Sequence, residues 1–244
     1  MPLSFGFGKG SIFKATPGAS APVFAGVTSS LALWLDPSNA SCYSGSGTTL
    51  TDLSGNGLNC TLTNGASVSG GYIVLDGTND TVNTNSNVDL RQNFTLECWV
   101  RPNISTNFSF FGHGSTPTSS GLHLLWQPQT SRTFLFGMMN NDVSKNMPAN
   151  SYPANVWYHV VITYNHTTFV KKAYVNGVDA GLTQEQTQAA YIAAPNILRF
   201  GAYYSSGPAL YGNGNFGQLR YYTQALSAAD VLVNYNATKS AFGL

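Results

Sequence analysis

Acidic side chains are the first residues to consider for catalysis, because hydrolysis of a glycosidic bond needs two of them close together. Retaining glycosidases hold their two carboxyl groups about 5–5.5 Å apart, one as acid and one as nucleophile. Alternate positions of one strand can supply that spacing. Among the ten acidic residues the only glutamates, Glu97 and Glu185, are far apart, and no two aspartates alternate within an expected strand. We therefore expect no glycosidase activity and assign no catalytic residue.

Other residue patterns that are typical of enzymes are also missing. The sequence has no G-x-S-x-G, no phosphate-binding loop of the P-loop type and no histidine pair that opens a helix at metal-ligand spacing. His113, between Gly112 and Gly114, and His123, two residues after Gly121, could share a metal if their strands form a hairpin. Two unrelated histidines are the simpler interpretation. We expect a protein that is not an enzyme and requires no cofactor.

Recognition of a glycan or a protein partner needs aromatic rings and hydrogen-bonding groups. A loop rich in glycine and serine, from Ala202 to Asn215, carries three tyrosines, and loops that expose aromatic rings are often contact surfaces. Trp99 shares the more polar face of an expected strand with a glutamate and an arginine, although core packing is the stronger interpretation for Trp99. The candidate contact residues are Tyr203, Tyr204, Tyr211, Trp99, Glu97 and Arg101.

The N-terminal residues 1–28 differ from the rest of the chain. Phe5, Phe7 and Phe13 are spaced among glycines, and a spacer rich in Pro, Ala and Ser follows at residues 16–22. Two alternatives are open: a mobile terminus, or an assembly arm whose phenylalanines dock on a neighbouring subunit, since free rings would otherwise face water. We treat residues 1–28 as an extended arm and residues 29–244 as one domain.

The composition limits the class of partner. Only 9% of the residues are charged and the net charge is +1, so the chain lacks the basic surface that binds nucleic acid or anionic membranes. No stretch is long and apolar enough to span a membrane, and residues 1–10 lack the apolar core of a secretory signal. Of the three cysteines, Cys42 and Cys60 could pair, with free thiols the alternative, and Cys98 is expected in the core.

The elements that must position these residues are strands. Runs of alternating or wholly apolar residues predict at least ten, and Asn176-Gly177 predicts a tight hairpin turn because both residues tolerate positive φ. Ser227 and Asp230 form a capping box that predicts one helix from about Ala228 to Lys239. The expected architecture is all-β, two antiparallel sheets packed as a jelly-roll sandwich with one short C-terminal helix. The predicted strands are residues 31–35, 72–75, 94–101, 108–111, 122–126, 133–138, 157–164, 169–175, 197–200 and 216–222.

Taken in order, seven short stretches between residues 31 and 240 resemble the concanavalin A-like lectin/glucanase superfamily, in its laminin G-like branch. The resemblance implies a sandwich in which one sheet is concave and can hold a glycan groove. The stretches are Leu33–Asp36, Asp52–Gly57, Leu75–Asp80, Phe94–Pro102, Trp157–Val160, Tyr174–Gly177 and Phe216–Arg220 with Ala225–Ser227.

The resemblance also implies a possible calcium site, because relatives of this type often bind calcium. Calcium takes six to eight oxygen ligands, and the loops around Asp76–Asp80 and Asp52–Asn56 offer carboxylate and amide oxygens. Asp and Asn are equally the best turn formers. Asp76 and Asp80 are the first residues to test as calcium ligands.

Two functions fit these features. The first is a structural protein of a virion, such as a phage capsid-decoration, tail or fibre subunit, located on the particle surface. Its partners would be other copies of itself or other virion proteins, and host-surface glycans. The missing catalytic groups, the aromatic arm and the low charge favour it. The second is a free carbohydrate-binding lectin, or the binding module of a carbohydrate-active protein.

Overall fold

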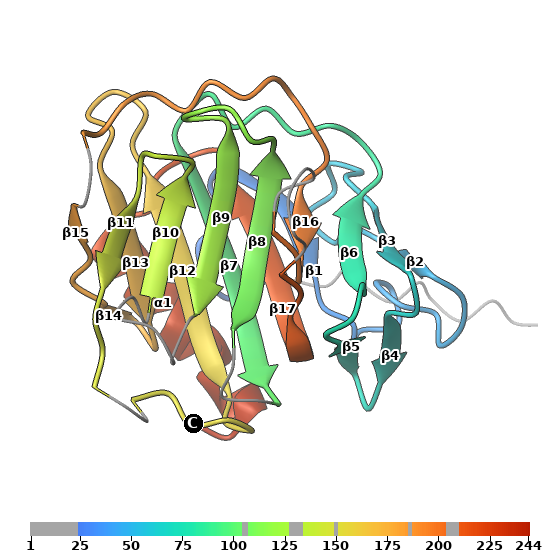
Figure 1. The fold of residues 1–244 in the computed structure, drawn as a ribbon. Coiled ribbons are helices and arrows are strands. Elements are labelled where there is room, and N and C mark those ends of the chain that lie inside the picture. Colours follow the sequence, from blue (N-terminus) through green and yellow to red (C-terminus); the bar gives the residue numbers. More distant parts are fainter. Residues whose placement is uncertain (1–23, 104–106, 127–133, 149–150, 185–186, 204–209) are drawn as a thin grey trace, which may run out of the picture.

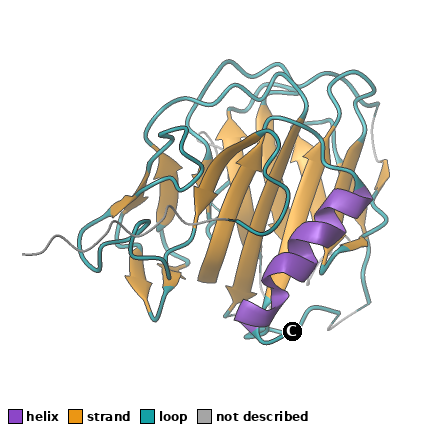
Figure 2. Cartoon of the chain, turned by 180° about the vertical axis from the view of Figure 1, so that it is seen from behind, coloured by secondary structure: helices purple, strands orange, loops and turns teal. Residues whose placement is uncertain are grey.

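The computed structural model describes residues 24–103, 107–126, 134–148, 151–184, 187–203 and 210–244 (Figure 1). Two antiparallel sheets pack face to face, and one helix lies across the back of one sheet, as Figure 2 shows from behind. The predicted all-β sandwich with a C-terminal helix is therefore confirmed. No helix among these residues is long and apolar enough to cross a membrane.

Sheet A has eight strands and carries the helix on its outer face. Its long central strands pair antiparallel and in register over most of their length. Strand β1 (Leu31–Leu35) pairs with β17 beside the main path. The other strands, in spatial order, are β14 (Val178–Asp179), β13 (Lys171–Val175), β12 (Tyr158–Tyr164), β7 (Phe94–Pro102), β17 (Asn213–Tyr222), β5 (Tyr72–Asp76) and β4 (Ser67–Ser69).

Sheet B has nine strands and forms the front layer of Figure 1. All its pairings are antiparallel, and a bulge in β8 between Ser109 and Phe111 shifts the register against β9. In spatial order the strands are β15 (Thr183–Gln184), β11 (Val143–Lys145), β10 (Phe134–Met138), β9 (Gly121–Trp126), β8 (Phe108–Gly114), β16 (Arg199–Phe200), β6 (Thr81–Thr84), β3 (Cys60–Thr63) and β2 (Thr49–Leu50).

The main hydrophobic core lies between the two sheets, and a smaller one lies between sheet A and the helix. The smaller core contains Val161, Tyr174, Tyr222, Leu226 and Val231. Every residue of β12 is buried, as its two apolar faces predict, because sheet A is covered by sheet B on one side and by the helix on the other. All three cysteines are buried and free, so the alternative of free thiols at Cys42 and Cys60 holds.

The helix α1 (Ala228–Thr238) begins at the predicted capping box. The backbone N–H of Asp230 donates to Ser227 Oγ at 3.2 Å, and the N–H of Ser227 donates to Asp230 Oδ2 at 3.0 Å. A short 3₁₀ helix, η1 (Lys239–Phe242), follows. The predicted hairpin is also present: Asn176 and Gly177 have φ of 51° and 81° and join β13 to β14.

All ten predicted strands exist, with ends shifted by a few residues. The strands that the sequence pattern missed are short and rich in Thr, Ser and Asn, among them β3 and β6. They lack a run of apolar residues because only one of their faces meets the core, so the periodicity signal is weak. The polar faces of these two missed strands turn out to matter most for the candidate site.

The arm proposed for residues 1–28 is described only from Phe24 onward; Phe5, Phe7 and Phe13 lie outside the described residues. The ring of Phe24 is buried, with its centroid 5.5 Å from that of Trp34. The backbone N–H of Val27 donates to Asn234 Oδ1 of α1 at 2.8 Å. The last residues of the arm therefore pack against the domain.

Candidate binding site

A single row of residues crosses the outer face of sheet B. Strand register places Thr61 opposite Asn83, Asn83 opposite Arg199, and Arg199 opposite Gly112. The row continues from Gly112 to His123 and from His123 to Gly137. Cross-strand partners share a face, and their neighbours along the strands, such as Phe200 and Val82, point into the core. We call these residues the Arg199 row.

The two glycines of the row make space for other groups. A Cβ on Gly112 would overlap the backbone of Ala202 and Tyr203, and a Cβ on Gly137 would overlap the ring of His123. The segment that begins at Gly201 is tied to sheet B, since its N–H donates to the carbonyl of Phe110 at 2.9 Å. It crosses the row at Gly112 and divides it into an Arg199 end and a His123 end.

The His123 end is closed. The ring of His123 is 2% exposed, and its centroid lies 4.7 Å from that of Tyr203. Its Nδ1 is 2.9 Å from the carbonyl oxygen of Gly121, and its Nε2 is 3.8 Å from Asp142 Oδ1. Burial lowers the pKa of His123, although the Asp142 charge opposes that shift. This end of the row is packed structure that a ligand cannot reach.

The Arg199 end is half-open and polar. Thr61, Asn83, Arg199 and Tyr211 are all half-buried. Burial lowers the pKa of Arg199 from its ordinary value, and the hydroxyl of Tyr211 nearby partly opposes the shift. Asn83 Nδ2 is 3.4 Å from Thr63 Oγ1 on β3. The result is a patch of hydroxyl, amide and guanidinium groups beside one aromatic ring.

Two atoms of this end are buried without a hydrogen-bond partner. They are Nη1 of Arg199, a donor, and Oδ1 of Asn83, an acceptor. Buried polar atoms in native proteins are nearly always paired, and an exception calls for an explanation such as a bound molecule. The Arg199 end is therefore a candidate place for a ligand.

The three tyrosines predicted as a recognition loop are placed as follows. Tyr211 pairs with Ala202 in an isolated bridge and lies at the Arg199 end. Tyr203 packs on His123 at the closed end. Tyr204 lies outside the described residues. Of the three, Tyr211 is the one that the structure brings to the open part of the row.

The contact role predicted for Glu97 and Trp99 is wrong for a ligand arriving from solvent, because both side chains are fully buried under α1. The ring of Trp99 stacks on Phe242 with centroids 4.2 Å apart, and its Nε1 donates to Thr238 Oγ1 at 2.9 Å. Arg101 lies on sheet A, away from the Arg199 row, and donates to Asn215 Oδ1 at 3.1 Å. The helix that covers this strand face was predicted, but its docking place was not.

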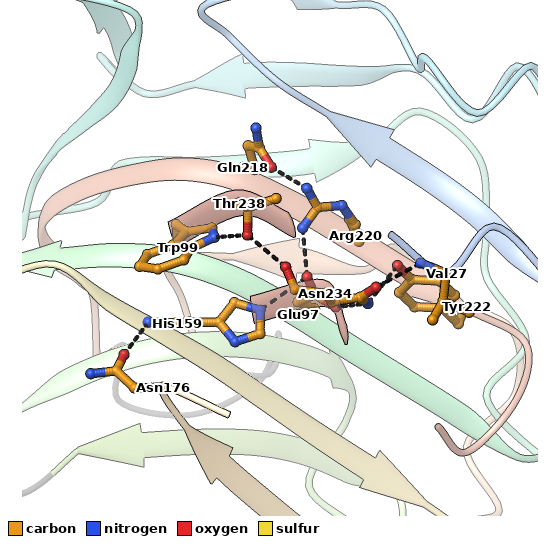
Figure 3. A network of polar contacts seen from close by, with 10 residues as sticks. All are labelled: Val27, Glu97, Trp99, His159, Asn176, Gln218, Arg220, Tyr222, Asn234 and Thr238. Carbon is orange, nitrogen blue, oxygen red and sulfur yellow. Dashed lines mark hydrogen bonds and ion pairs between the residues drawn. The ribbon is translucent and has the colours of Figure 1, made fainter. Parts of the chain in front are cut away.

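Glu97 is the centre of a buried polar network between sheet A and α1, drawn in Figure 3. Its Oε1 accepts a hydrogen bond from Arg220 Nη1 at 2.5 Å. The same oxygen lies 3.0 Å from His159 Nε2, in a direction that is poor for a hydrogen bond. Its Oε2 accepts from Asn234 Nδ2 of α1 at 2.7 Å.

Burial by itself would raise the pKa of Glu97, but Arg220 first, and then His159 and Asn234, lower it to about 2. The carboxylate is therefore ionised and fully engaged. Phe24 closes the network from outside, since the Arg220 guanidinium lies 3.9 Å from its ring centroid. The network is a structural link between the arm, sheet A and α1, and its partners are basic and amide groups instead of a second carboxyl group.

Of the predicted calcium ligands, Asp76 ends β5 and Asp80 lies in the loop between β5 and β6. Asp80 Oδ2 accepts from the backbone N–H of Asp76 at 3.0 Å, and Asp76 Oδ1 accepts from that of Thr78 at 2.7 Å. These bonds are the turn-forming role that was the alternative. Asp80 Oδ1 is buried and without a partner. The carboxylates of Asp76 and Asp80 alone supply fewer than the six to eight oxygens that calcium takes, and the calcium site stays a prediction.

The shared metal considered for His113 and His123 is wrong. Along β8 and β9, His113 pairs with Leu122 and His123 pairs with Gly112, so the two rings point to opposite faces of sheet B. His113 is fully buried, with Nδ1 2.8 Å from the Tyr191 hydroxyl and Nε2 2.8 Å from the Val88 carbonyl oxygen. No group of three His, Cys, Asp or Glu residues among those described could hold a metal ion.

Residues 76–232, more than half of the chain, match the laminin G-type family described as the concanavalin A-like lectin/glucanases superfamily. The chain belongs to this superfamily. The family resemblance predicted from the seven sequence stretches is therefore confirmed. No protein of curated function matches the sequence.

Solved structures of similar fold include Trypanosoma rangeli sialidase in complex with sialic acid, with a TM-score of 0.64 and 15% identity over 92% of this chain and 35% of that one. A second is the binding domain of botulinum neurotoxin serotype D, with a TM-score of 0.61 and 14% identity over 87% of this chain and 52% of that one. The chain thus spans about a third to a half of the length of these proteins. At such identities the likeness shows the fold alone.

Sequence reasoning missed Thr61, Asn83 and Arg199. A signal for Arg199 was present: it stands between Leu198 and Phe200 in a predicted strand, and it is one of few charges in the chain. Alternation alone puts such a residue on the outer face. Its neighbours could not be found in the same way, because they lie on strands that the pattern did not predict.

Proposed function

We propose that this chain is a carbohydrate-binding domain that does not catalyse a reaction, and that it binds through the Arg199 end of the row on sheet B. The observation that carries the proposal is the half-open patch of Thr61, Asn83 and Arg199 beside the ring of Tyr211. Sugars present hydroxyl groups and apolar ring faces together. A surface that combines amide, hydroxyl and guanidinium groups with an aromatic ring matches both.

The family supports this proposal, since the superfamily contains lectins. Two proteins of the same fold are described by what they bind: the sialidase structure holds sialic acid, and the neurotoxin segment is a binding domain. The absence of catalysis rests on the chain's own acids. Glu97 is buried in the network under α1, and Glu185, outside the described residues, is far from it in sequence.

The test is a glycan array followed by calorimetric titration with the best ligand. We expect saturable binding, and we expect Tyr211→Ala to weaken it about tenfold or more, as loss of an aromatic contact worth about 1.4 kcal/mol would do. The matched control is Tyr43→Ala, which removes another half-buried tyrosine, from the loop after β1. No binding on a broad array, or equal effects of the two variants, contradicts the proposal.

The virion assignment stays a separate prediction from the sequence, and with it the location on a particle surface and the partnership with other virion proteins. Carbohydrate binding has the stronger support, because membership of the superfamily supports binding of a sugar and says nothing about a location in a virion. Mass spectrometry of purified particles tests the virion prediction directly. A virion protein can also carry a glycan-binding domain, so the two results are independent.

A further inference from the structure

Arg199 differs from the other arginines that the structure describes. Arg91 pairs with Asp89 at 2.7 Å, Arg220 pairs with Glu97, and Arg101 donates to Asn215. Among the described residues, the side chain of Arg199 makes no hydrogen bond or ion pair. Within the part of the chain that the structure describes, the half-buried guanidinium of Arg199 therefore has no anion beside it.

An unpaired guanidinium in this position is unfavourable for the free protein. Arginine stays charged at any physiological pH, and moving a charge out of water is costly unless it is paired. Arg199 sits on β16 between β6 and β8, so its backbone is fixed by pairing on both sides. An anion from outside the chain would supply the missing partner.

The neighbouring orphan atom specifies what else that anion must carry. Asn83 lies opposite Arg199 on β6, and its Oδ1 is a buried acceptor without a donor. Both orphan atoms are covered from solvent, but each residue is half-buried, so a ligand reaches the other atoms of the two side chains. It needs an oxyanion for the guanidinium and, next to it, a hydroxyl for the amide. A sugar with a carboxylate or sulfate substituent beside a free hydroxyl has this arrangement, and its ring face can lie against Tyr211.

We propose that the ligand of the Arg199 end is an acidic saccharide, whose carboxylate or sulfate group pairs with the Arg199 guanidinium and whose adjacent hydroxyl contacts the Asn83 amide. This inference rests on the proposed carbohydrate binding and narrows it to one class of sugar. Charge-assisted hydrogen bonds to guanidinium are stronger than neutral ones, especially when bidentate. With a net charge of only +1, the chain has no broad basic surface that attracts anions in general. Selection of the acidic ligand therefore depends on the single ion pair with Arg199.

The experiment compares matched pairs of saccharides. One pair is a uronic-acid oligosaccharide and its carboxyl-reduced, neutral counterpart; the other is a sulfated oligosaccharide and its desulfated form. We expect the acidic member of at least one pair to bind ten times more tightly or better. Which pair shows the difference identifies the anion as carboxylate or sulfate.

Three variants assign the difference to Arg199. Arg199→Gln should remove the preference for the acidic member while weaker binding of the neutral member persists, and Arg199→Lys should keep part of the preference. Arg91→Gln, at an exposed arginine paired with Asp89, is the control and should retain it. Since the Arg199 side chain makes no polar contact with the described residues, Arg199→Gln should not lower the melting temperature, whereas loss of a structural arginine would.

The outcomes separate this inference from the proposed function. If neutral sugars bind as well as acidic ones and Tyr211→Ala weakens both, carbohydrate binding stands and the acidic ligand is refuted. If Arg199→Gln weakens binding of the acidic and the neutral member of a pair equally, Arg199 does not distinguish the charged saccharide from the neutral one, and the inference fails. If neither member of any pair binds, the proposed function itself fails.

Discussion

The buried carboxylate of Glu97 should make the stability of the protein depend on pH in a way that can be worked out from its contacts. Its pKa falls from an ordinary value of 4.5 to about 2, because the contacts with Arg220, His159 and Asn234 outweigh the effect of burial. A shift of that size corresponds to about 3 kcal/mol of stability. Since the folded pKa is the lower one, this contribution is complete above about pH 5 and is lost progressively towards about pH 2.

The perturbation is Glu97→Gln, measured by urea unfolding followed by tryptophan fluorescence between neutral and acidic pH. The variant leaves the Arg220 guanidinium, which is fully buried, without its anion. We expect it to lower the free energy of unfolding by about 3–5 kcal/mol at neutral pH. The difference from the unmodified protein should shrink as the pH falls, because the native carboxylate becomes protonated too.

A surface carboxylate provides the control for this experiment. The pKa of Asp89 is also lowered to about 2, by its hydrogen bonds with Arg91, but its side chain is 44% exposed. Solvent screens such a pair, so Asp89→Asn should change the acid profile much less than Glu97→Gln. Equal profiles for the two variants, or a Glu97→Gln protein as stable as the original at neutral pH, would refute the reasoning.

Three further predictions concern the arm, the hairpin and calcium. Removing residues 1–23 should leave the free energy of unfolding unchanged, whereas removing residues 1–28 should lower it by about 3 kcal/mol through loss of the buried Phe24. Light scattering on the protein that lacks residues 1–23 also tests the role of the arm in assembly. An unchanged oligomeric state would exclude that role. Gly177→Ala should cost about 1–2 kcal/mol in the same assay, because φ at this position is 81°, and a neutral effect would mean that the turn can change type. If calcium binds at Asp76 and Asp80, added calcium should raise the melting temperature and Asp80→Asn should abolish that rise; identical melting with calcium and with chelator would discard the site.

The architecture could be predicted from the sequence because its signals are local. Apolar runs marked the central strands, Ser227 and Asp230 marked the start of α1, and Asn176-Gly177 marked a tight turn. Each depends on residues within a few positions of one another, and the same local order carried the family resemblance. The low charge of the chain also predicts that it does not bind nucleic acid electrostatically, which stays a prediction.

Tertiary structure decided which of these residues reach solvent. Glu97 and Arg199 are both charged residues on strands with apolar neighbours, and nothing local separates them. Docking of α1 buries Glu97 with Arg220, while the pairing of β16 between β6 and β8 leaves Arg199 half-open beside Asn83. Helix docking and strand order join segments more than eighty residues apart in the sequence, and no local pattern encodes them. The candidate site therefore became visible only when the strands were in register.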